Sequence, residues 1–125
     1  MIRGLGIDLF EVARMERDLG EKGDAFKQEV FTPDEIAYCD AMHHPAQHYA
    51  VRLAAKEAVI KALALEGSAY FFWRDVEIRR EADGRPRAVL HGRVRELAER
   101  QGVRCVHVSL SHTRELALAA AAAEA

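Results

Sequence analysis

The chain has 125 residues, of which 50% are hydrophobic and 30% are charged, and this length predicts one compact domain over residues 1–125. The formal net charge of −2 gives no strong field for nucleic acid or an anionic membrane. No apolar run is clean enough to span a bilayer, and the first residues lack signal-peptide features. We therefore expect a cytoplasmic protein that binds neither nucleic acid nor a membrane.

The chain is expected to begin with a strand and a helix. Residues 2–8 are apolar enough for a short buried strand. Residues 11–19 then mix apolar and charged side chains at helical spacing, and Gly20 and Gly23 are expected to end this helix.

A capping box begins the next helix. In Phe31-Thr32-Pro33-Asp34-Glu35 the threonine is placed as N-cap, the proline at the first helical position, and the glutamate three residues after the cap. This helix is predicted to run to about Met42, before the break at His43-His44-Pro45.

Residues 46–65 form the clearest helix in the sequence, because they are rich in alanine and contain neither Gly nor Pro. Few of their side chains are charged, so most of the circumference must face protein. We therefore expect a central, largely buried helix.

The second half predicts antiparallel strands. Residues 73–80 alternate in polarity, with Glu77 on the polar side, and the turn at 83–86 joins them to residues 87–91 as a hairpin. A short helix over 94–101 should then end at Gly102.

Residues 103–111 alternate again, and residues 116–123 could pair with them across a turn at 112–115. The alanine-rich end, 116–125, could also be a helix. This order of elements predicts an α+β domain whose mainly antiparallel sheet packs on a long buried helix.

The cysteines and one group of histidines are of types that can bind metals. Cys39 and Cys105 follow no paired zinc or redox spacing, and their apolar neighbours predict buried, reduced thiols. His43, His44 and His48 cluster without a regular ligand spacing, which argues against a zinc site there.

Two carboxylates are candidates for a magnesium site. Asp8 follows the first strand and Glu57 lies in the long helix. Magnesium takes oxygen ligands and is often held by one or two carboxylates together with substrate phosphates. Interpretations without a metal stay open, because Asp8 could cap a helix or turn and Glu57 could pair with Lys61 one helical turn away.

Lys61 and His112 are further candidates. Lys61 shares a helical face with Glu57, whereas Lys56 points away from that face. Its charge could neutralise a departing phosphate or form a salt bridge of little energy. His112 ends a strand among hydroxyl groups, where it could bind a ligand or stabilise a turn.

Five short sequence blocks occur once each along the chain, at defined spacing. They are Gly6-Ile7-Asp8 with Glu11 and Arg14, residues 31–35, the helical run from Arg52 to Ala62, residues 73–77, and Val108-Ser109-Leu110-Ser111-His112-Thr113. In this order they resemble the holo-[acyl-carrier-protein] synthases, which are small, single-domain 4′-phosphopantetheinyl transferases, and they cover nearly the whole chain.

The resemblance implies an α+β fold and a homotrimer whose active sites lie between adjacent subunits. It also implies that coenzyme A donates its 4′-phosphopantetheine arm to a serine of apo acyl carrier protein, for fatty acid or polyketide biosynthesis. Adenosine 3′,5′-bisphosphate would be released.

By the same resemblance, Asp8 and Glu57 would bind Mg²⁺ with the coenzyme A diphosphate, and Lys61 would face that diphosphate. Displacement at phosphorus needs mainly positioning and charge neutralisation, which such a group supplies. Glu57 or a magnesium-bound water would take the serine proton, and the sequence does not choose between them.

The resemblance assigns the remaining residues to the two substrates. Arg52, His112 and Thr113 would bind coenzyme A near its nucleotide and 3′-phosphate. Arg14 would meet the acidic recognition helix of the carrier protein.

Residues 64–72 depart from the family, because they hold one glycine and several aromatic residues where relatives have a glycine-rich turn. The aromatics would stack on adenine or, as we favour, fill a subunit interface. Two other function classes remain open: a non-catalytic module that binds coenzyme A or the carrier protein, and a metal-dependent phosphohydrolase.

Overall fold

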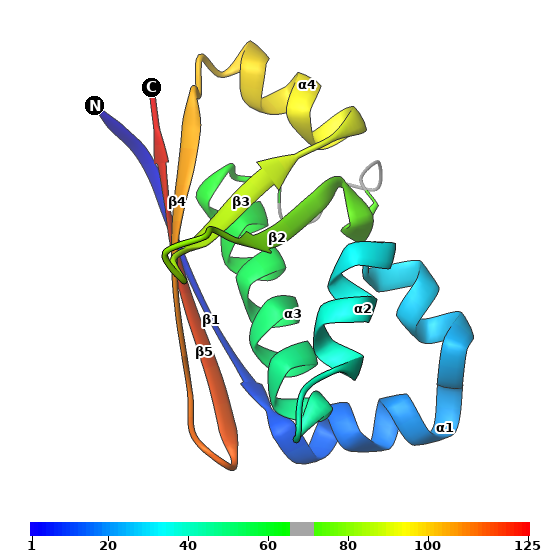
Figure 1. Cartoon of the computed structure of the whole chain (residues 1–125). Coiled ribbons are helices and arrows are strands. Elements are labelled where there is room, and N and C mark those ends of the chain that lie inside the picture. The colour runs from blue at the N-terminus through cyan, green and yellow to red at the C-terminus, as the bar shows by residue number, and fades with distance from the viewer. Residues whose placement is uncertain (66–71) are drawn as a thin grey trace.

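The computed structural model describes residues 1–65 and 72–125. Its largest feature is a three-stranded antiparallel sheet with strand order β1-β5-β4, against which the long helix α3 packs (Figure 1). The strands are β1 (Ile2–Glu11), β5 (Leu116–Glu124) and β4 (Cys105–His112). The predicted α+β class, with an antiparallel sheet on a long buried helix, is confirmed.

The alanine-rich end is the central strand of this sheet and not a helix. Ala117, Ala119, Ala121 and Ala123 face the core, and their small side chains let α3 lie close to the sheet. Strand β5 pairs antiparallel with both β1 and β4, so its backbone hydrogen bonds are met on both sides.

Strand β1 differs from the predicted buried strand over residues 2–8. It continues to Glu11, and only one of its faces is covered, while Leu5, Ile7 and Leu9 are exposed on the other. On the covered face, a Cβ added to Gly6 would lie 1.9 Å from the carbonyl oxygen of Ala58 in α3. Only glycine permits this approach of the strand to the helix.

The first helix, α1 (Val12–Val30), is longer than predicted. Gly20 is helical, so the expected end there is wrong. At Gly23, where an end was also predicted, the backbone does leave the helical conformation (φ 61°, ψ −142°), which kinks the chain before helix resumes. It resumes because Phe26 and Val30 still pack against the core.

Helix α2 (Pro33–Asp40) begins at the predicted capping box. Thr32 Oγ1 accepts a hydrogen bond from the Glu35 backbone N–H at 3.2 Å, and Glu35 Oε1 accepts one from the Thr32 N–H at 2.9 Å. The helix ends two residues before Met42.

Helix α3 (Pro45–Ala62) confirms the predicted long, buried helix, although it ends three residues before Leu65. Figure 1 shows α3 at the centre of the molecule, with the three-stranded sheet on one side and α2 on the other. Among the described helices, none is long and apolar enough to cross a membrane.

The predicted hairpin is confirmed as β2 (Val76–Arg80) and β3 (Pro86–Leu90), which pair antiparallel. Residues Trp73–Asp75 before it form a 3₁₀ turn and are not part of the strand. Glu77, expected on the polar side of the strand, is buried, and Thr32, Arg79 and His91 all form hydrogen bonds with its carboxylate. Helix α4 (Gly92–Arg100) follows.

The two cysteines have different surroundings. Cys39 is buried, as predicted, and burial raises the pKa of its thiol to about 12. Cys105 is exposed, so the prediction of a buried thiol there is wrong. Strand alternation turns the neighbouring Val106 toward the core and Cys105 away from it.

Candidate functional site

The contact between β1 and α3 brings Asp8 and Glu57 together. Gly6 lies against the helix backbone at Ala58, and Asp8 follows two residues later on the same face of β1. Glu57 precedes Ala58 on α3. The close approach that glycine allows therefore places a strand carboxylate beside a helical carboxylate.

The surroundings of Glu57 perturb its carboxyl group. Burial raises the pKa of Glu57 to about 7, and the negative charge of Asp8 and a hydrogen bond with it add to this effect. The positive charges of Lys61 and Arg14 oppose the shift. Such a perturbed carboxyl group is typical of functional sites.

Lys61 joins this pair from the next turn of α3. Its ammonium nitrogen lies 3.3 Å from Asp8 Oδ1 and donates a hydrogen bond to the Ile7 carbonyl oxygen at 3.2 Å. The side chain is one-third exposed, so its charge remains available at the rim of the site. The structure thus brings Asp8, Glu57 and Lys61 into one group, which we call the carboxylate site.

The carboxylate site fits a hard divalent cation. Asp8 Oδ2 is buried and has no hydrogen-bond partner among the described residues. When both carboxylates are ionised, their oxygens only accept hydrogen bonds, so a shared proton or a cation is needed between them. An all-oxygen donor set suits Mg²⁺.

Arg14 lies at the surface beside the carboxylate site. It is exposed in the first turns of α1, and its guanidinium carbon lies 5.0 Å from the centre of the Phe10 ring. Its charge reaches Glu57, as the lowering effect on the pKa of that residue shows.

A second group of candidate residues lines a cavity of about 410 Å³, which we call the basic cavity. His48 and Arg52 of α3, Arg80 and Arg85 of the hairpin, and His112 of β4 all lie on its wall. Because several cations converge here, the cavity suits a ligand that carries phosphate groups.

Arg52 is the buried cation of this cavity. Its guanidinium lies 4.0 Å from the centre of the Tyr38 ring, and its Nε is buried without a hydrogen-bond partner among the described residues. A buried donor without a partner is unfavourable, so an acceptor from a ligand would stabilise it. The ring of His48 lies 5.4 Å from that of His112, and burial, followed by the charge of Arg52, lowers the pKa of His48.

Within one chain, the two groups do not converge. Asp8 is on β1 and the basic cavity lies beside β4, and β5 separates these strands in the sheet. Thr113 is in the turn between β4 and β5, where its Oγ1 accepts hydrogen bonds from the N–H groups of Glu115 and Leu116. The aromatic segment over 64–72 falls largely outside the described residues.

Sequence reasoning missed Arg80, Arg85 and Tyr38. The only available signal was the excess of basic side chains in the second half of the chain. It could not show that the hairpin folds back beside α3 and β4.

Comparison with known proteins gives consistent results. The family model described as 4′-phosphopantetheinyl transferase superfamily matches residues 4–121. The holo-[acyl-carrier-protein] synthase of Moorella thermoacetica is 48% identical over 119 residues, which are 95% of this chain and 91% of that protein. That of Koribacter versatilis is 40% identical over 95% of both chains.

Solved structures agree with these sequence relatives. The holo-[acyl-carrier-protein] synthase from Neisseria meningitidis has a TM-score of 0.88 and 30% identity, and the match covers 100% of both chains. The Bacillus anthracis synthase in complex with CoA (3′,5′-ADP) has a TM-score of 0.82 and 29% identity. That match covers 100% of this chain and 98% of the other.

Proposed function

Because the chain belongs to the 4′-phosphopantetheinyl transferase superfamily, we propose that it is a holo-[acyl-carrier-protein] synthase. It transfers the 4′-phosphopantetheine group of coenzyme A to a serine of apo acyl carrier protein in the cytoplasm. The products are holo acyl carrier protein, for fatty acid or polyketide biosynthesis, and adenosine 3′,5′-bisphosphate.

The basic cavity takes the nucleotide of coenzyme A in this proposal. The observation that carries it is that Arg52, which lines this cavity, has a buried Nε without a hydrogen-bond partner among the described residues. His112 and the exposed Arg80 and Arg85 add donors around the same volume. Thr113, which follows His112 at the end of β4, stabilises the turn beside these residues.

The carboxylate site takes the diphosphate and the reacting serine. Asp8 and Glu57 would hold Mg²⁺, which when bound would neutralise the diphosphate charge. Lys61 faces the same phosphates and stabilises the charge on the departing oxygen. The serine oxygen forms the new bond to phosphorus as the bond to adenosine 3′,5′-bisphosphate breaks.

Glu57 is the base that accepts the serine proton in this scheme. Without a metal, burial raises the pKa of Glu57 to about 7, which suits a proton acceptor near neutral pH. A bound cation would lower that pKa, so a magnesium-bound water is the alternative base. Lys61 keeps Asp8 oriented through the 3.3 Å ion pair.

We place the complete active site between the subunits of a homotrimer. Support comes from the separation of the carboxylate site and the basic cavity on opposite edges of the sheet. The uncovered face of that sheet also carries Leu5, Ile7, Leu9 and Leu118, which are exposed in the single chain. An apolar surface of this kind is typical of a subunit interface.

Arg14 is positioned to receive the carrier protein. It is exposed at the edge of the carboxylate site, where an acidic helix that carries the serine would have to approach. A guanidinium there would pair with the carboxylates of that helix.

The test is a transfer assay with apo acyl carrier protein, coenzyme A and magnesium, followed by mass spectrometry of the carrier. We expect the carrier to gain the mass of phosphopantetheine. An unmodified carrier with bound coenzyme A would indicate a non-catalytic binding module. Product release without any carrier would indicate a phosphohydrolase.

A further inference from the structure

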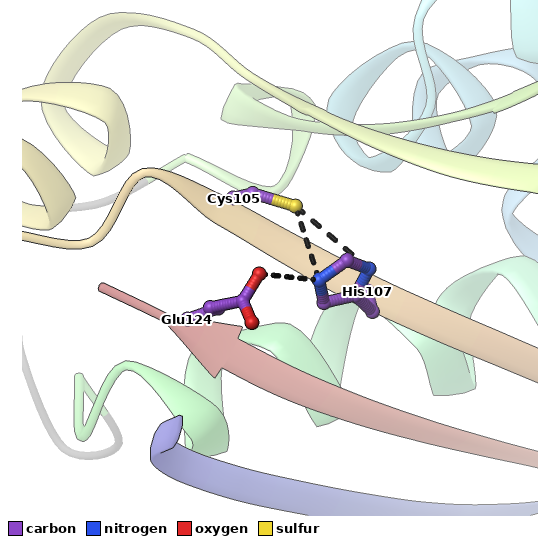
Figure 2. A group of neighbouring side chains, drawn as sticks. All are labelled: Cys105, His107 and Glu124. Carbon is purple, nitrogen blue, oxygen red and sulfur yellow. Dashed lines mark hydrogen bonds and ion pairs between the residues drawn. The ribbon is translucent and has the colours of Figure 1, made fainter. Parts of the chain in front are cut away.

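A cluster of three unlike metal-binding side chains lies outside both groups described above. Figure 2 shows Cys105 and His107 on β4 and Glu124 on β5, with their side chains turned toward one another. Residues two apart on a strand share a face, and Cys105 pairs directly with Glu124 across the sheet. The β-sheet register therefore brings these side chains together.

The distances match those between the ligands of a tetrahedral zinc ion. Zinc–sulfur and zinc–nitrogen bonds of about 2.3 and 2.1 Å place the two ligand atoms about 3.6 Å apart, and nitrogen and oxygen ligands lie about 3.3 Å apart. In the structure, His107 Nε2 lies 3.4 Å from Cys105 Sγ and 3.1 Å from Glu124 Oε1. All three ligand atoms lie within 4.8 Å of one another.

We propose that Cys105, His107 and Glu124 bind a divalent transition metal of the zinc type. Sulfur, nitrogen and oxygen donors are the set that Zn²⁺ accepts, whereas the all-oxygen carboxylate site suits Mg²⁺. A water or a group from another molecule takes the fourth position.

The alternative use of these residues is a reactive thiol, with His107 as its base and Glu124 orienting the histidine. That arrangement needs one ring nitrogen toward the thiol and the other toward the carboxylate. Here the same atom, Nε2, is the nearest nitrogen to Cys105 Sγ and bonds to Glu124. The three side chains therefore point toward one position between them, which is the arrangement expected of metal ligands.

A metal here would join β4 to β5 beside both ends of the chain. The Arg104 N–H donates to the Glu124 carbonyl oxygen at 2.8 Å, and the N-terminal amine of Met1 donates to the Ala125 carbonyl oxygen at 3.2 Å. The cluster also lies on the uncovered face of the sheet, at one end of the apolar surface that we assign to subunit contacts. Binding should therefore stabilise this end of the sheet.

The direct test titrates the full-length, reduced protein with cobalt chloride and zinc chloride in the presence of excess magnesium. We expect one metal per chain and a thiolate-to-cobalt charge-transfer absorption that zinc abolishes. C105S should abolish this absorption, and H107A should weaken binding more than about 100-fold, beyond the ~10–100-fold loss expected for a merely supporting group. E124Q should weaken binding as well.

Matched variants H43A and E115Q change an exposed histidine and an exposed glutamate elsewhere, and they should bind metal as the unchanged chain does. A second readout is the thermal unfolding midpoint, which zinc should raise in the unchanged chain and in H43A but not in C105S or H107A. Circular dichroism checks that the variants fold.

Absence of binding, binding that C105S and H107A leave unchanged, or one metal per three chains would each overturn the proposal. None of these measurements uses coenzyme A or a carrier protein. The outcome is therefore independent of the proposed transferase activity.

Discussion

Lys56 Nζ lies 2.8 Å from Glu35 Oε1, and both side chains are buried. Lys56 also donates to the carbonyl oxygens of Trp73 and Val76, while Glu35 Oε2 accepts a hydrogen bond from the Ile78 N–H at 2.9 Å. This network joins α3 to α2 and to the hairpin. It fixes the rotation of α3, and hence the direction in which Glu57, the next residue, points.

Replacing Lys56 by alanine should strongly destabilise the protein. The change leaves the Glu35 carboxylate buried without its cation, which lowers the free energy of unfolding by about 3–5 kcal/mol. Urea denaturation followed by circular dichroism measures this loss. The control is K22A, which removes a largely exposed lysine in a 3.5 Å pair with Asp18 and should change stability by less than about 1 kcal/mol. Equal effects of the two variants would show that the buried pair does not hold α3.

Gly6→Ala should push β1 away from α3. The new Cβ would lie 1.9 Å from the Ala58 carbonyl oxygen, so the strand must move. We expect a loss of about 1–3 kcal/mol or more in stability and a fall in transfer activity, because Asp8 moves with the strand.

The matched control for this change is Gly20→Ala. That glycine is helical, and no neighbouring atom lies within 4 Å of the position that a Cβ would take, so the change should stabilise the helix by up to about 1 kcal/mol. Thermal unfolding and the transfer assay, run on both variants, separate the two effects. If Gly6→Ala behaved like Gly20→Ala, the close contact of β1 with α3 would be refuted.

The raised pKa of Glu57 predicts a pH dependence of stability in metal-free protein. A carboxyl group whose pKa rises from 4.5 to about 7 on folding favours the folded state most below its unfolded pKa. That contribution is lost as the pH rises through the folded pKa. The unchanged chain should therefore lose stability relative to E57Q between about pH 5 and pH 8.

Urea denaturation of both proteins in EDTA across this range measures the difference. E115Q, which alters an exposed glutamate, should follow the unchanged chain at every pH. A constant difference between the unchanged chain and E57Q would contradict the raised pKa.

The sequence predicted local features well because their causes are local. The capping box at Thr32 depends on hydrogen bonds within four residues, and the hairpin depends on its own turn. By contrast, the alanine-rich end left strand and helix open, because its side chains carry no polarity pattern. This segment is a strand because its backbone pairs with both β1 and β4.

Prediction of the functional sites was limited in the same way, because contacts between distant segments could not be read from the sequence. Asp8, Glu57 and Lys61 were predicted from residue type and family resemblance, and the structure brings them together. Arg85 joins Arg52 only through the path of the hairpin. Similarly, Cys105 and Glu124 come together through strand register, which no short sequence spacing encodes.

The location of the active site between subunits can be tested by mixing two inactive variants. D8A disables the carboxylate site, and R52M removes the guanidinium of the basic cavity while keeping its apolar stem. Each variant alone should lose at least about 100-fold in transfer rate, D8A mainly in kcat and R52M mainly in KM for coenzyme A.

After the two variants are unfolded together and refolded, sites that form between chains would combine an intact Asp8 with an intact Arg52. In a ring of randomly mixed subunits, about one interface in four would do so, and about a quarter of the original activity should return. The control mixes each variant with a D8A/R52M double variant, which can supply no complementary half. If the mixture of single variants were no more active than these controls, the complete site would lie within one chain, and the proposed role of the apolar sheet face would need another explanation.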